Sequence, residues 1–163
     1  MTGTEPKETR LKFLLIATDC PEARLTAYFT ARRAKHSNAD VILLHVIEPT
    51  DGAHWATVAE TMRAEAYELA HTCLDEFCQI VESEIGKKPE ALIREGPKVD
   101  EISKLIEEDP QIAILFLGAS TNPDGPGPLV SALAQQPDYL GTRPIPVTVV
   151  PGSIDLETLR HLS

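Results

Sequence analysis

The chain has 163 residues, 42% of them apolar and 25% charged, which is enough for one globular domain with a full core. Its formal net charge of −10 argues against nucleic-acid binding, and the one basic cluster, Arg32, Arg33 and Lys35, is typical of a solvated helix face. No apolar run approaches the roughly 20 residues that cross a bilayer, and three cysteines without a disulfide-framework spacing indicate reduced thiols in a cytoplasmic protein.

Strands and helices alternate along the chain. Segments rich in apolar residues predict strands at 11–18, 40–47, 90–94, 112–117 and 146–150. Helical periodicity predicts helices at 24–36, 55–85, 98–108 and 129–136. This order predicts an α/β fold, a doubly wound five-stranded parallel sheet with helices on both faces. Ligands of such sheets bind beyond the carboxyl ends of the strands, where the winding reverses.

Local signals predict where the first two helices begin and end and which of their positions are apolar. Asp19 is a candidate N-cap of the first helix, ahead of Pro21. That helix has apolar residues at Leu25, Tyr28 and Phe29 and, more weakly, at Ala27, Ala31 and Ala34, with a polar opposite side, and Ser37-Asn38 ends it. The long second helix has apolar positions at Trp55, Val58, Ala59, Met62, Ala66, Leu69, Ala70, Cys73, Leu74, Phe77, Ile80, Val81 and Ile85, and ends at Gly86.

A glycine-rich connection follows the fourth strand. Gly118 ends the apolar run, a loop of Pro, Gly and polar residues comes next, and a short helix begins near residue 129. This arrangement cradles phosphates in many α/β proteins. Here, however, Pro123, Pro126 and Pro128 have no N–H to donate, and Asp124 would repel an anion. No Lys or Arg lies between residues 120 and 141, so the loop disfavours a triphosphate and leaves a nucleoside or smaller ligand open.

Five segments together resemble the universal stress protein (UspA) family. They are FLLIATD, LLHVIEP, IREGP, ILFLGAS and PIPVTVVP, spread over residues 11–151. The resemblance implies the strand order 3-2-1-4-5 in a Rossmann-like, adenine nucleotide alpha hydrolase-like domain. It also implies a homodimer paired through strand five, and an ATP site in some members only. Residues 1–10 would be a polar extension, and residues 152–163 a tail with a short helix, in which Leu156, Leu159 and Leu162 recur at spacing three.

The same resemblance implies site residues. ATP-binding members carry G-x2-G-x9-G-[S/T] after strand four, which Gly118 starts correctly, but Thr121 stands at the second glycine and Ser131, followed by Ala132, at the third. Gly125 and Gly127 could substitute if the loop takes another route. The resemblance further places Asp19 near the adenosine and Val46 near the adenine. The strand-five residues Val147, Val149 and Val150 are the candidate dimer contacts.

Other cysteine and histidine positions have simpler interpretations. Cys20 lies near a helix N-terminus, which favours a reactive thiolate, but Asp19 and Glu22 beside it disfavour one. Cys73, Cys78 and His45 are interpreted as core residues, and Glu68, His71 and Asp75 as an exposed helix face without enough ligands for a metal.

These features predict a cytoplasmic regulatory or binding module of the universal stress type. It requires no cofactor, contacts neither nucleic acid nor membrane, and catalyses at most slow ATP hydrolysis. The alternative is a nucleotide-binding switch that holds ATP in the cleft between strands one and four. A redox sensor at Cys20 is a third hypothesis.

Overall fold

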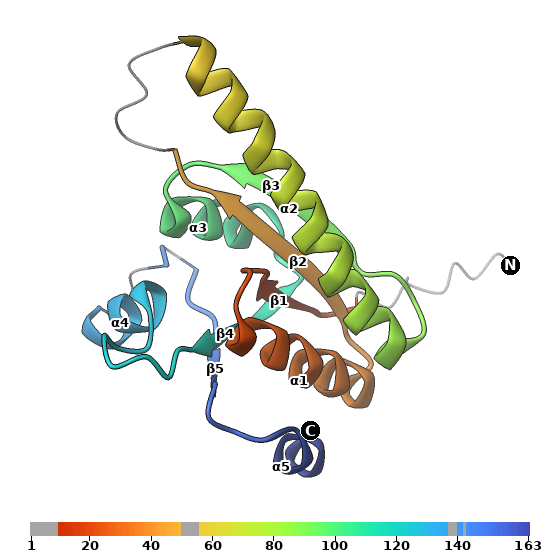
Figure 1. Ribbon diagram of the computed structural model, residues 1–163. Coiled ribbons are helices and arrows are strands. Elements are labelled where there is room, and N and C mark those ends of the chain that lie inside the picture. The colour runs from red at the N-terminus through yellow and green to blue at the C-terminus, as the bar shows by residue number, and fades with distance from the viewer. Residues whose placement is uncertain (1–9, 50–55, 137–139, 142) are drawn as a thin grey trace, which may run out of the picture.

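The computed structural model describes residues 10–49, 56–136, 140–141 and 143–163, which form one parallel sheet flanked by helices (Figure 1). The strands are β1 (Lys12–Ile16), β2 (Asp40–Ile47), β3 (Glu90–Glu95), β4 (Ile112–Ala119) and β5 (Val147–Pro151). The helices are α1 (Pro21–Ser37), α2 (Ala56–Ile85), α3 (Lys98–Glu108), α4 (Pro128–Gln135) and α5 (Leu156–Leu162). The sheet order is β3-β2-β1-β4-β5, which confirms the predicted doubly wound fold. Residues 1–9 of the predicted extension, and Trp55, lie outside the described residues.

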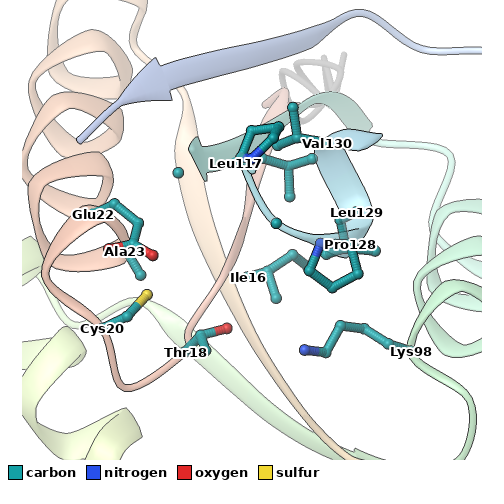
Figure 2. A pocket seen from close by; sticks show the side chains of 13 residues that line it. Ile16, Thr18, Cys20, Glu22, Ala23, Lys98, Leu117, Pro128, Leu129 and Val130 are labelled. Carbon is teal, nitrogen blue, oxygen red and sulfur yellow. The ribbon is translucent and has the colours of Figure 1, made fainter. Parts of the chain in front are cut away.

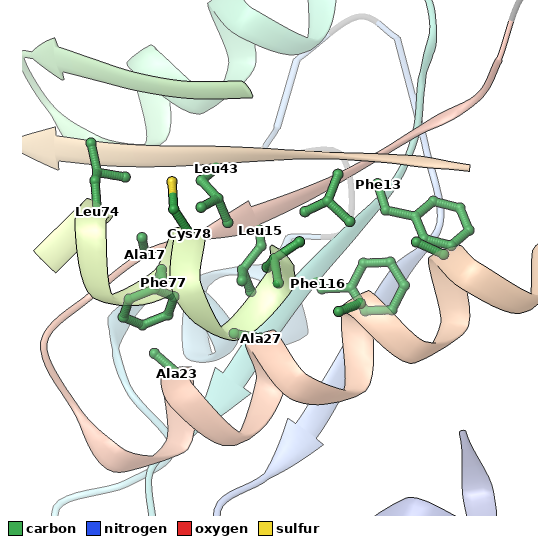
Figure 3. Close-up of a cluster of buried hydrophobic side chains, with 14 of the residues drawn as sticks. Phe13, Leu15, Ala17, Ala23, Ala27, Leu43, Leu74, Phe77, Cys78 and Phe116 are labelled. Atoms are coloured by element: carbon green, nitrogen blue, oxygen red, sulfur yellow. The ribbon is translucent and has the colours of Figure 1, made fainter. Parts of the chain in front are cut away.

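Each strand sends alternate side chains to opposite faces of the sheet. In β1, Phe13 and Leu15 pack with α1 and α2, as Figure 3 shows, whereas Leu14 and Ile16 pack with α3. The central strands are therefore covered on both sides, which explains their unbroken apolar sequences. None of the described helices combines the length and apolar character needed to cross a membrane.

Helix α1 packs on the sheet through small residues, and among its predicted apolar positions Ala27, Ala31 and Ala34 are the fully buried ones. Its buried residues are Ala23, Thr26, Ala27, Thr30, Ala31 and Ala34. The larger side chains of Leu25, Tyr28 and Phe29 are only partly buried. The reason is the short distance between α1 and β4: a Cβ on Gly118 would lie 2.7 Å from the carbonyl oxygen of Glu22.

The strand β4 ends later than predicted, and the close approach of α1 explains why a glycine stands within it. The apolar run predicted an end before Gly118, but the strand continues through Gly118 and Ala119, which pair with Val150 and Pro151. Glycine is needed there for space, and it does not interrupt the strand.

The C-terminal ends of α1 and α2 agree with the sequence prediction, whereas the N-cap of α1 differs from it. Asn38 takes the left-handed conformation (φ 52°) after α1, and Gly86 (φ 77°) ends α2 as predicted. Asp19 is not the N-cap of α1, because Cys20 occupies that position. The Asp19 carboxylate instead accepts a hydrogen bond from Arg24.

Only the second half of α2 lies on the sheet. Ala70, Leu74 and Phe77 are buried, whereas Met62 and Leu69 are exposed. In Figure 1 the first half of α2 projects past the end of β2, which agrees with the exposure of Met62 and Leu69. Met62 and Leu69 thus fit the apolar periodicity of the helix but are not part of the core.

Helix α5 packs against α1. Arg32 donates to the Ser163 hydroxyl at 2.7 Å, and Arg160 donates to the Tyr28 hydroxyl at 3.1 Å. Of the leucines at spacing three, Leu159 is buried, but Leu156 and Leu162 are exposed.

Candidate functional site

Two cavities lie at the carboxyl end of the sheet, where β1 and β4 are neighbours. The chain leaves β1 towards α1 on one face and reaches β4 from α3 on the other, so this is the point where the winding reverses. The first cavity, here called the switch-point pocket, has a volume of about 110 Å³ (Figure 2). Its lining residues are Ile16, Thr18, Cys20, Glu22, Ala23, Lys98, Leu117, Gly118, Pro126, Gly127, Pro128, Leu129 and Val130.

The second cavity, here called the outer cleft, measures about 600 Å³. It is lined by Glu48, Pro49, Pro97, Lys98, Val99, Asp100, Pro128, Leu129 and Ala132. The two cavities share Lys98, Pro128 and Leu129, so they adjoin. Small-molecule sites typically occupy about 300–1,000 Å³. The switch-point pocket alone is too small for a nucleotide, but together with the outer cleft it is large enough.

Lys98, the first residue of α3, lines both cavities. Figure 2 shows its amino group and the Thr18 hydroxyl pointing toward each other across the switch-point pocket. The sequence prediction considered only the cations of residues 120–141, whereas Lys98 follows β3 and not β4. The signal was present in the sequence: Lys98 follows Gly96-Pro97 directly after a parallel strand, whose carboxyl end must lie at this edge of the sheet.

The glycine loop uses much of its hydrogen-bonding capacity on itself. The amide of Ser120 donates to the Pro126 carbonyl at 3.0 Å, and that of Gly125 donates to the Asn122 carbonyl at 3.1 Å. The amide of Asn122 donates to the Ser120 hydroxyl at 3.1 Å. Amides that are already bonded, together with the prolines, leave few donors for phosphate oxygens.

The predicted loop residues do not all reach the cavities. Gly118 and Gly127 line the switch-point pocket. Thr121, Gly125 and Ser131 are absent from the lining of both cavities. The structure thus brings together only part of the set that the resemblance implied.

Asp19 and Val46 also lie outside both linings. The Asp19 side chain is 79% exposed and paired with Arg24. Val46 is buried in the core cluster that includes α3 residues. The sequence neighbours of Asp19, Thr18 and Cys20, line the switch-point pocket instead.

The Cys20 thiol is a weak nucleophile in this setting. Its burial raises the pKa of the thiol, Glu22 raises that pKa further, and only the Ala23 amide and Arg24 oppose the shift. A raised pKa keeps the thiol protonated at neutral pH, which argues against the redox-sensor hypothesis.

His45 makes the hydrogen bond that was predicted, but it is only partly buried and belongs to neither core cluster. Its Nδ1 lies 2.8 Å from the Ala17 carbonyl oxygen, and burial lowers the pKa of the imidazole. Among the residues that the structure describes, no group of three or more His, Cys, Asp or Glu side chains converges as a metal site.

Comparison with known proteins agrees with this architecture. The family model described as the universal stress protein family matches residues 11–151. The universal stress protein UspA from Lactobacillus plantarum is 16% identical with a TM-score of 0.71, over 86% of this chain and 97% of that chain. No curated protein matches the sequence.

Two further solved structures of similar fold were determined with nucleotides. A universal stress protein in complex with cAMP is 15% identical with a TM-score of 0.60, over 88% of this chain and 98% of that chain. The universal stress protein from Archaeoglobus fulgidus in complex with dAMP is 15% identical with a TM-score of 0.55, over 86% of this chain and 96% of that chain. At these identities the likeness establishes the fold.

Proposed function

The chain belongs to the universal stress protein family, and from this premise we propose that it is a cytoplasmic regulatory module that binds an adenine nucleotide carrying one phosphate. Binding and release of the ligand, and not turnover, would be its activity. The observation that supports this most directly is the pair of adjoining cavities at the switch point, with one lysine between them.

The charges around the cavities favour a monophosphate over a triphosphate. The carboxylates of Glu22, Glu48 and Asp100 line the cavities, against the single ammonium group of Lys98. Two like charges at about 4 Å repel by about 4 kcal/mol near a protein surface. A hydrogen bond to a charged group returns about 1.5–3 kcal/mol. With the loop amides bonded internally, the contacts do not offset the repulsion that a triphosphate would meet.

The relatives of known structure support the same ligand class. The complexes with cAMP and dAMP each hold a nucleotide with one phosphate. The alternative function is an ATP-binding switch with slow hydrolysis, which would require the loop of residues 120–127 to rearrange and release its amides.

Calorimetry with adenosine, AMP, cAMP and Mg-ATP tests the proposal, together with mass spectrometry of any small molecule released when the purified protein is denatured. We expect AMP or cAMP to bind at least tenfold more tightly than Mg-ATP. Mg-ATP as the tightest ligand would favour the switch. Neither heat nor a thermal shift with any of the four ligands at millimolar concentration would reject nucleotide binding.

We also propose a homodimer through β5. The two edge strands of the sheet differ in charge: β3 carries Glu90, Arg94 and Glu95, whereas β5 reads VTVVP without a charge. Charged side chains protect an edge from pairing with another chain, so β5 is the edge better suited to pair. Within β5, Val149 is 40% exposed but Val150 only 3%, so Val149 is the stronger candidate for a side-chain contact.

A further inference from the structure

Lys98 differs from the other cations of the molecule. Among the Lys and Arg side chains that the structure describes, Lys98 alone is both partly buried and without a hydrogen bond or ion pair. The other partly buried cations have partners: Lys12 with Asp109, Arg24 with Glu76, Arg32 with Ser163, Arg94 with Glu108, and Arg143 with the Ile106 carbonyl. Lys98 is partly buried, carries a positive charge that no carboxylate of the described residues neutralises, and lines two cavities, so it is suited to bind an anionic group of a ligand.

Further hydrogen-bond donors belong to the residues that line the switch-point pocket. Leu129 and Val130, in the first turn of α4, line the switch-point pocket. Their amides precede the first donor of the helical ladder, the Ser131 amide, which bonds the Gly127 carbonyl at 3.0 Å. The Thr18 hydroxyl faces Lys98 from the end of β1 (Figure 2). An anionic oxygen between these groups would therefore meet donors from three different segments.

We propose that Lys98 is the anion-recognition residue of this site and that the ligand's single phosphate binds between Lys98 and the first turn of α4. This inference rests on the proposed function and adds the group that selects the ligand. It places the phosphate against the start of α3 and not in the loop of residues 120–127. The nucleoside would then extend into the outer cleft, the larger of the two cavities.

The contribution of the phosphate charge to the binding affinity can be measured separately from that of the nucleoside. Binding of AMP and of adenosine is measured by calorimetry for the wild-type protein and for Lys98→Met, Lys98→Arg and Lys35→Met. Lys35→Met is the matched control, because it removes the same charge from an exposed residue that lines neither cavity. Loss of one charge-assisted hydrogen bond is expected to weaken AMP binding on the order of ten- to a hundredfold in Lys98→Met. Adenosine binding is expected to change by less than about twofold, because adenosine carries no charge.

The controls separate failure of this inference from failure of the proposed function. Lys98→Arg should retain most of the AMP affinity, since it keeps the charge, and Lys35→Met should match the wild type. AMP affinity that is equal in Lys98→Met and Lys35→Met would overturn the role of Lys98 and leave the proposed function standing. An equal loss of adenosine and AMP affinity in Lys98→Met would also overturn it, because the residue would then only support the pocket. A wild-type protein that binds neither ligand would overturn the proposed function and this inference together.

Discussion

Gly118 shows how a residue typical of phosphate loops can be required for packing alone. A Cβ at this position would meet the Glu22 carbonyl oxygen at 2.7 Å and the Thr26 hydroxyl at 2.9 Å. We expect Gly118→Ala to destabilise the protein by about 1–3 kcal/mol, because α1 must move away from β4. Urea unfolding measures the loss. Gly86→Asn is the control, since a Cβ at this position would meet no atom of the described residues within 4 Å and asparagine tolerates its φ of 77°. A Gly118→Ala protein as stable as the wild type would show that the contact relaxes freely.

At the scale of the element, α2 combines a half that packs on the sheet with a half that does not. Phe77 is fully buried in the cluster shown in Figure 3, whereas Leu69, two turns earlier, is 70% exposed. Phe77→Ala should therefore cost about 3–5 kcal/mol of unfolding free energy. Leu69→Ala should change it by less than about 0.5 kcal/mol, as exposed substitutions usually do. Chemical denaturation of the two variants measures both values. A large loss in Leu69→Ala would mean that another chain or segment covers this half of α2 in solution.

At the scale of the whole molecule, the proposed pairing of two copies through β5 can be tested directly. If β5 pairs two copies, Val149→Asp should convert the dimer to a monomer, because a buried, unpaired carboxylate costs several kcal/mol. Light scattering after size-exclusion chromatography at micromolar concentration gives the mass. Leu162→Asp is the matched control, because Leu162 is 60% exposed on α5, outside β5, and should leave the dimer intact. A dimer that survives Val149→Asp, or a monomeric wild type, would exclude pairing through β5.

The order and type of the elements were determined by the sequence, since they depend on local patterns. Continuous apolar runs and periodic helices led to the doubly wound sheet, and Asn38 and Gly86 marked helix ends through their backbone freedom. The prolines and Asp124 likewise predicted, from the sequence alone, that the loop after β4 is poorly suited to bind a triphosphate.

Facts that depend on distance between segments were decided only by the tertiary structure. The side of α1 that faces inward follows from its short distance to Gly118, and the exposure of Leu69 follows from where the sheet ends. The placement of Lys98 between the two cavities, and of Asp19 outside them, results from three segments meeting at one edge of the sheet. Sequence periodicity describes one helix or strand at a time. It therefore cannot show that a lysine that follows one strand faces a cavity formed by the segments after two other strands.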